Sequence, residues 1–210
     1  MKEHEVMLAL HETEGIGWET MLAIVEAVPD LTLFLEHPAT ELLANTKVSP
    51  RKASKIEHLL TYEYIEGKLN FYKSRGVRPI AFFETDYPPL LRHVFRPPWV
   101  VYTKGRLELL HKPSVAVVGT RQPTAYGREV AEWFGAELAR YGLPVVSGLA
   151  RGIDSCAHRG ALRTGGETVA VLAGGLNVSY PPEHAGLMRS IAERGLIISE
   201  YRWDARPSKA

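Results

Sequence analysis

Two arginines stand in glycine-bearing loops, where their side chains could bind an anion. Arg121 lies in the segment VAVVGTRQPTAYG, residues 115–127, and Arg151 lies in VVSGLARGIDSCAH, residues 145–158. A guanidinium group beside the N-terminus of a helix is suited to bidentate contact with phosphate. The alternative interpretation is that both side chains are solvated, or that they pair with a nearby acid such as Asp154. Two arginines in aligned glycine loops favour the anion site.

A third loop of the same kind follows in VAVLAGGLNVSYPPEH, residues 169–184. In all three segments a short apolar run leads through glycine into a predicted helix. The first turn of a helix presents free backbone N–H groups and the positive end of the helix dipole, and both favour phosphate. Because parallel strands end at one edge of their sheet, we expect the three loops to lie together where open α/β sheets bind ligands.

Capping residues mark the helices that separate these strands. Thr124 and Asp154 are predicted N-caps, and Gly142, Gly165 and Gly195 stand where the three helices end. The resulting βαβαβαβ order predicts an α/β fold with a mostly parallel, doubly wound sheet of the Rossmann type.

The chain divides near residue 75. Residues 1–75 carry apolar side chains at helical spacing, interrupted by prolines, and predict a small all-helical domain. Residues 76–210 form the predicted α/β domain, which extra strands at 77–83 and 99–102 extend. Within the helical part, GIG at residues 15–17 resembles the turn of a helix-hairpin-helix DNA-binding element. The glutamates around it favour a plain turn between helices, because acids oppose phosphate binding.

No pattern predicts a cofactor, a metal ion or catalysis. No loop reads G-x-G-x-x-G, and Ser147 and Gly148 stand where a ribose-binding carboxylate would end the second strand. The eight histidines are scattered and there is one cysteine, so metal-ligand spacing is missing. Asp154 and His158 could form an acid–base pair, but no nucleophile is placed to use it. We expect Asp154 to cap its helix and His158 to bond nearby backbone.

The composition is consistent with a small protein whose basic patch is local. The 210 residues, 45% hydrophobic, suffice for one full domain and a smaller one. A net charge of +1 gives no global attraction to nucleic acid. The single cysteine, Cys156, excludes an internal disulfide, and we interpret it as a packing residue. There is no signal peptide pattern and no apolar stretch of ~18 residues, so we expect a cytoplasmic protein with no membrane contact.

Three of the loop strings, VGTRQPTAYG, SGLARGIDSCAHRGAL and TVAVLAGGLNVSYPPEH, resemble the bacterial DNA-processing protein A family, DprA or Smf. The upstream segment ETDYPPLLRHVFRPPWVVYTKG resembles the family too. The resemblance implies a Rossmann-like sheet with extra strands, preceded by a small all-helical domain of the SAM or helix-hairpin-helix type. It also implies a cytoplasmic, non-enzymatic protein of natural transformation and recombination that binds single-stranded DNA, protects it and helps load the RecA recombinase.

The resemblance places the DNA-binding site in the three loops. In the family, the arginine at the position of Arg121 lies in a basic pocket that holds the DNA backbone, and loop N–H groups complete it. The candidate residues are Gly119, Thr120, Arg121, Thr124, Tyr126, Gly127, Ser147, Gly148, Arg151, Gly152, Gly174, Gly175, Leu176 and Tyr180. The tyrosines could stack bases for ~1–3 kcal/mol each, although packing is the alternative. The family's third loop offers a basic residue near the Y-P pair, whereas this chain reads NVSYPPE.

After the strand ending in I-S-E, residues 198–200, the family continues into further strands that carry its dimerisation and RecA surfaces. This chain reads YRWDARPSKA and stops at Ala210, so it is either a truncated piece or a shortened member. We therefore expect residues 196–199, or a neighbouring strand, to form an uncovered edge. The family's homodimer is doubtful here, and the charged, proline-containing tail favours a monomer.

Two other functions remain open. A related Rossmann-like superfamily contains the nucleoside-monophosphate phosphoribohydrolases, whose catalysis depends on a PGG-x-GT-x-x-E segment. Here AGGLNVSYPPEH lacks the GT and the placed glutamate, which leaves a small-nucleotide binder without catalysis. The third possibility is an interaction module that docks a recombinase through its helical domain.

Overall fold

The computed structural model describes residues 1–207, and residues 208–210 of the expected second domain lie outside this part. The chain forms two compact units and passes from the first to the second between Val101 and Tyr102. This passage lies inside a strand, whereas the last α-helix of the first unit ends at Lys73, close to the division expected near residue 75.

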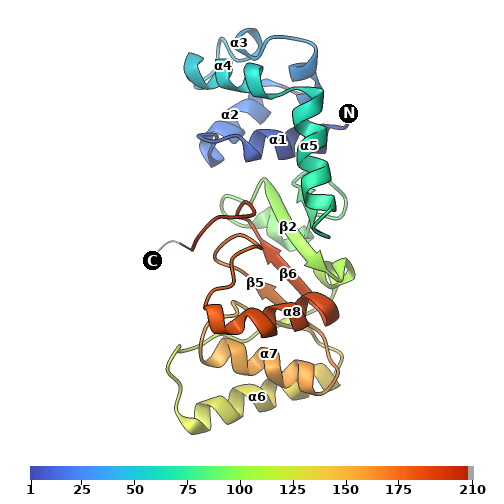
Figure 1. The fold of residues 1–210 in the computed structure, drawn as a ribbon, viewed down its shortest axis with the longest axis vertical. Coiled ribbons are helices and arrows are strands. Elements are labelled where there is room, and N and C mark those ends of the chain that lie inside the picture. The colour runs from blue at the N-terminus through green and yellow to red at the C-terminus, as the bar shows by residue number, and fades with distance from the viewer. Residues whose placement is uncertain (208–210) are drawn as a thin grey trace. The chain divides into compact units, whose positions relative to one another are not determined.

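All regular elements before residue 75 are helical (Figure 1). They are α1 (Glu3–Glu12), α2 (Trp18–Ala27), the 3-10 turn η1 (Leu31–Leu35), α3 (Ala39–Leu42), α4 (Pro50–Leu59) and α5 (Tyr62–Lys73). Pro50 occupies the first turn of α4, where its missing N–H group removes no helical hydrogen bond. Apolar side chains buried from α1, α2, α4 and α5 make the interior, among them Met7, Leu10, Met21, Ile24, Ile56 and Ile65.

One six-stranded sheet has the order β1-β2-β6-β5-β4-β3. The strands are β1 (Arg78–Ala81), β2 (Val100–Gly105), β3 (Val115–Ala116), β4 (Val145–Ser147), β5 (Thr168–Val171) and β6 (Leu196–Ser199). Strands β3 to β6 pair in parallel, and β2 pairs antiparallel to β6 with Tyr102 opposite Ser199. The predicted Rossmann-like, mostly parallel sheet with extra strands is confirmed.

Three helices alternate with the parallel strands: α6 (Ala125–Arg140), α7 (Ile153–Arg163) and α8 (Ala185–Arg194). The short 3-10 turns η2 (Pro89–His93), η3 (Leu107–His111) and η4 (Pro182–His184) lie in the connections. Glycines let α6 and α7 approach closely, because a Cβ on Gly135 would lie 2.1 Å from the Ala157 carbonyl oxygen. Figure 1 shows α6, α7 and α8 as one layer. The strands follow one another in a single direction across the sheet, from β3 to β6. Right-handed crossovers therefore place all three helices on one face, and the expected double winding does not occur within residues 1–207.

The uncovered edge of the sheet is not where the sequence predicts it. Strand β6 is paired on both sides, by β2 and β5, and its residues 196–199 are buried. Within residues 1–207 the unpaired edges belong to β1 and β3. Beside β3, Val118 is 73% exposed. The prediction is wrong for β6 and for its neighbours β2 and β5, which are also paired on both sides. The reason is that β2, distant in sequence, pairs with the side of β6 that the βαβ order alone leaves open.

Candidate anion-binding site

Hydrogen bonds tie the three glycine loops together at the carboxyl ends of β3, β4 and β5. The Ile153 N–H, from the second loop, donates to the Thr120 carbonyl of the first at 3.2 Å. His184 of the third loop donates through Nδ1 to the Leu149 carbonyl of the second at 2.9 Å. The predicted gathering of the loops at one sheet edge is therefore confirmed.

The glycines of the first two loops are there because the loops pass very close to each other. Gly152 has φ +82°, and a Cβ there would lie 2.3 Å from the Thr120 carbonyl oxygen. A Cβ on Gly119 would lie 2.7 Å from the Ile153 side chain. The Thr124 hydroxyl accepts the Gly127 N–H at 3.1 Å, so the predicted N-cap of α6 is confirmed. Together these contacts fix the backbone that carries Arg121.

Four arginines line a hollow of about 440 Å³ formed by the first two loops and helices α6 and α7. They are Arg121, Arg128, Arg151 and Arg159, and we call this site the arginine hollow. Its other lining residues are Gln122, Pro123, Gly152, Ser155, Cys156 and His184. Burial raises the pKa of the Cys156 thiol, so this residue lines the hollow as a neutral thiol.

One carboxylate, that of Glu183, pairs with an arginine of the hollow. Arg151 Nε donates to Glu183 Oε1 at 2.5 Å, and both side chains are more than half exposed. The hydrogen bond from Arg151 lowers the pKa of Glu183 to about 2 and raises that of Arg151. Four guanidinium groups and one carboxylate give a formal charge of 4 − 1 = +3. Such a concentration of positive charge suits a ligand with several anionic groups.

Asp154 does not cap α7 as the sequence predicts. The N-cap position is Gly152, and Asp154 lies in the first turn, where its Oδ2 accepts the Gly148 N–H at 3.0 Å. The positive φ of Gly152 turns the chain two residues before the expected cap, and the Asp154 carboxylate accepts a hydrogen bond from the second loop. The Gly148 N–H is consequently engaged within the protein.

The other polar groups of the second strand and of α7 are also used internally. Ser147 is buried, and its hydroxyl donates to the Val117 carbonyl at 2.7 Å. The Thr168 hydroxyl donates to the Val145 carbonyl, so it accepts the Nδ1–H of His158 at 2.6 Å. Burial lowers the pKa of His158 to about 4. A neutral, buried His158 bonded to Thr168 forms no acid–base pair with Asp154.

The glycines of the third loop support the protein's own chain. Gly174, Gly175 and Leu176 are buried. The Gly175 N–H donates to the Ala205 carbonyl at 2.7 Å, and a Cβ on Gly175 would lie 2.1 Å from the Trp203 carbonyl oxygen. These three candidate residues lie under the segment of residues 202–207 instead of facing solvent.

The two candidate tyrosines remain accessible. Tyr126 is 75% exposed at the start of α6, and Tyr180 is 55% exposed in the third loop. The alternative interpretation, that these rings pack inside the protein, requires them to be buried, and neither ring is. Both are therefore available to a ligand.

Sequence reasoning missed Arg128 and Arg159, although the structure brings both to the hollow. A signal existed in the helical spacing. Arg128 follows the N-cap Thr124 by four residues, and Arg159 follows Ser155 by four, so each shares a helix face with a residue at the loop end. A basic residue one turn beyond a glycine loop is therefore a sequence signal for this hollow.

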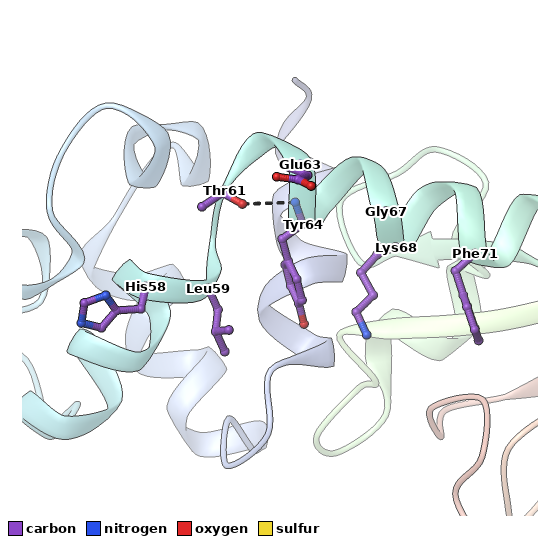
Figure 2. A pocket seen from close by; sticks show the side chains of 8 residues that line it. All are labelled: His58, Leu59, Thr61, Glu63, Tyr64, Gly67, Lys68 and Phe71. Atoms are coloured by element: carbon purple, nitrogen blue, oxygen red, sulfur yellow. Dashed lines mark hydrogen bonds between the residues drawn. The ribbon is translucent and has the colours of Figure 1, made fainter.

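A second hollow, of about 510 Å³, lies in the first unit, and we call it the helical groove. Its lining residues are His58, Leu59, Thr61, Glu63, Tyr64, Gly67, Lys68 and Phe71 (Figure 2). The Thr61 hydroxyl accepts the Tyr64 N–H and caps α5. Lys68 lies over the Tyr64 ring, and its Nζ pairs with Glu12 at 3.2 Å. Figure 2 shows Tyr64, Lys68 and Phe71 projecting to the same side of α5.

No group of three or more His, Cys, Asp and Glu side chains that could hold a metal ion occurs in residues 1–207. Within the same residues, none of the helices has the length and apolar character needed to cross a lipid bilayer.

Known solved structures share this fold. The X-ray structure of DNA processing protein A from Streptococcus pneumoniae has a TM-score of 0.81 and 27% identity over 100% of this chain and 71% of its own. DNA processing protein A from Helicobacter pylori has a TM-score of 0.55 and 32% identity over 63% of this chain and 59% of its own.

Curated sequences agree with the structures. DNA processing protein DprA of Bacillus subtilis is 33% identical over 86% of this chain and 61% of its own length. Protein Smf of Escherichia coli is 41% identical over 99% of this chain and 54% of its own length. The chain thus spans little more than half of these two relatives. The family model for DNA recombination-mediator protein A matches residues 78–210, and the chain belongs to this family.

Proposed function

We propose that this protein binds single-stranded DNA in the arginine hollow. The observation that carries the proposal is the cluster of four arginines in the hollow. Within the described residues, one carboxylate, that of Glu183, forms an ion pair with this cluster. The DNA backbone is a chain of phosphates that such a cluster can neutralise. The published structural study of the Helicobacter pylori relative concerns a single-stranded DNA binding mode of that protein, which supports the same ligand class here.

The strand would enter with its phosphates facing the loops and its bases facing outward. Arg121, Arg128 and Arg159 would contact phosphate oxygens through charge-assisted hydrogen bonds. The exposed rings of Tyr126 and Tyr180 would then be available to stack bases. A duplex holds its backbones on a stiff cylinder, so neither strand can follow a recess of about 440 Å³ closely. We therefore expect single strands to bind more tightly than duplex.

The family supplies the biological setting of the proposal. Its members are described as recombination mediators, and we propose that this protein acts in the cytoplasm during natural transformation and recombination, protects incoming strands and passes them to the RecA recombinase. We propose a non-enzymatic role, because the candidate acid–base pair of Asp154 and His158 is divided between Gly148 and Thr168.

Equilibrium binding to three ligands tests the proposal. Fluorescence anisotropy with labelled oligo(dT) and with a duplex of equal length, at one fixed salt concentration, should show tighter binding of the single strand, with an affinity that falls as salt rises. Equilibrium dialysis with AMP provides the contrast with a small-nucleotide binder. Tighter binding of AMP than of one oligo(dT) site, or tighter binding of duplex, would overturn the proposal.

A further inference from the structure

Glu183 stands where a DNA phosphate would be expected to meet Arg151. We infer that Glu183 is a built-in competitor for the DNA backbone, holding the Arg151 guanidinium until a strand displaces it and thereby lowering the affinity of the arginine hollow. This inference rests on the proposed function, since it concerns the same site. It assigns to the third loop a role in setting affinity.

The geometry presents the carboxylate from a firm support. Glu183 lies in η4 between Pro182 and His184, and His184 is 5% exposed and bonded to the Leu149 carbonyl. This anchor holds the third loop beside the second. The Glu183 side chain itself is 52% exposed, so it can swing into solvent without disturbing the loop. The competitor is thus held close to Arg151 and is still free to leave.

Carboxylate and phosphate compete because both are recognised by the same donors. A guanidinium group offers its N–H donors to either anion, and a phosphate brought beside an engaged carboxylate meets like charge. The low pKa of Glu183, about 2, keeps the carboxylate ionised at neutral pH. A strand must therefore either displace Glu183 or leave Arg151 unused.

The other arginines of the hollow are in a different state. Among the described residues, no carboxylate forms an ion pair with Arg121, Arg128 or Arg159. Arg128 donates to the backbone carbonyl of Pro123 at 2.7 Å, which orients it without neutralising it. Three of the four charges are thus available before DNA arrives, and the fourth becomes available when Glu183 leaves.

Removing the carboxylate should make Arg151 available from the start. Exposed ion pairs are weak, so Glu183→Gln should tighten oligo(dT) binding by up to about fivefold. The dependence of log affinity on log salt should steepen by about one, because one more cation is neutralised by DNA. Arg151→Ala should cost little in the natural chain and several-fold more in the Glu183→Gln background.

The experiment is an anisotropy titration of labelled oligo(dT) with the full chain and five variants: Glu183→Gln, Glu183→Ala, Arg151→Ala, the double variant Glu183→Gln/Arg151→Ala and Glu137→Gln. Glu137 pairs with Arg140 outside the hollow. Glu137→Gln therefore removes one negative charge, as Glu183→Gln does, but leaves the hollow unchanged. Tighter binding by both Glu183 variants and unchanged binding by Glu137→Gln would support the inference. Equal effects of Glu183→Gln and Glu137→Gln, or no change in either Glu183 variant, would overturn it.

A sixth variant separates failure of the inference from failure of the proposed function. Arg121→Ala removes a charge that Glu183 does not hold. If Arg121→Ala weakens binding and the Glu183 variants leave it unchanged, the competitor role fails and the DNA site stands. If Arg121→Ala also has no effect, the proposed function fails as well.

Discussion

The arginine hollow and the helical groove are similar in volume and differ in how their cations are used. In the groove, Lys68 is already paired with Glu12, whose side chain is 7% exposed, and lies over the Tyr64 ring. In the hollow, three arginines have no carboxylate partner among the described residues. In the groove, the charge of Lys68 is therefore used in an ion pair between α5 and α1. A cation in a hollow indicates ligand binding only when the fold has left its charge uncompensated.

The largest expected difference between the two regions is in their response to acid. His158, in the unit that carries the hollow, has a pKa lowered to about 4 by burial, against about 6.5 when unfolded. Above pH ~6.5 the imidazole is neutral in both the folded and the unfolded protein, so the full free energy of unfolding is present. As the pH falls from there towards 4, the unfolded state binds a proton that buried His158 does not, and the free energy of unfolding decreases. The loss amounts to about 3 kcal/mol over this range.

Chemical denaturation between pH 7.5 and 4, together with an NMR titration of the imidazole rings, checks this expectation. A His158 ring that titrates near pH 6.5, as a solvent-exposed histidine does, would contradict the account.

The next effect concerns DNA binding directly. Arg121→Ala should weaken oligo(dT) binding by roughly tenfold or more, because hydrogen bonds to charged groups contribute about 1.5–3 kcal/mol. The melting temperature should stay nearly constant, because the side chain is exposed and packs little. Anisotropy at fixed salt measures the first quantity and thermal unfolding the second. Equal affinity for the two proteins would remove Arg121 from the site.

Arg159 offers a smaller test of the same region. It lies on α7, away from the glycine loops, so Arg159→Ala should weaken binding several-fold and reduce the salt dependence by about one. Arg163→Ala, on the same helix but paired with Glu132, is the matched control and should leave binding almost unchanged. Identical losses for both variants would indicate a diffuse charge effect instead of a defined hollow.

The smallest effect is expected in the groove. Lys68→Ala should leave oligo(dT) binding unchanged and lower the free energy of unfolding by up to about 1 kcal/mol, since it removes the partner of Glu12. Urea denaturation and anisotropy on the same sample measure both. A loss of DNA affinity as large as that of Arg121→Ala would reverse the assignment of the two regions.

Features set by a few neighbouring residues could be predicted from the sequence. The glycine turns after β3, β4 and β5 and the Thr124 cap of α6 depend on local backbone preferences, and they were found where expected. The meeting of the loops at one edge follows from parallel strands. Asp154 does not cap α7, because the positive φ of Gly152 moves the cap by two positions.

Features set by distant residues could not be predicted. The burial of Gly174 and Gly175 depends on the return of residues 202–207 over the third loop. The place of β2 beside β6 depends on a pairing between segments about a hundred residues apart. Each of these requires the tertiary arrangement, which no local pattern specifies.

The most direct test of the central claim is to map where DNA binds. An amide NMR titration of the full chain with oligo(dT) should shift signals of residues 119–128 and 151–159 around the arginine hollow, and leave those of residues 58–71 in the helical groove in place. Shifts confined to residues 58–71 would contradict the account.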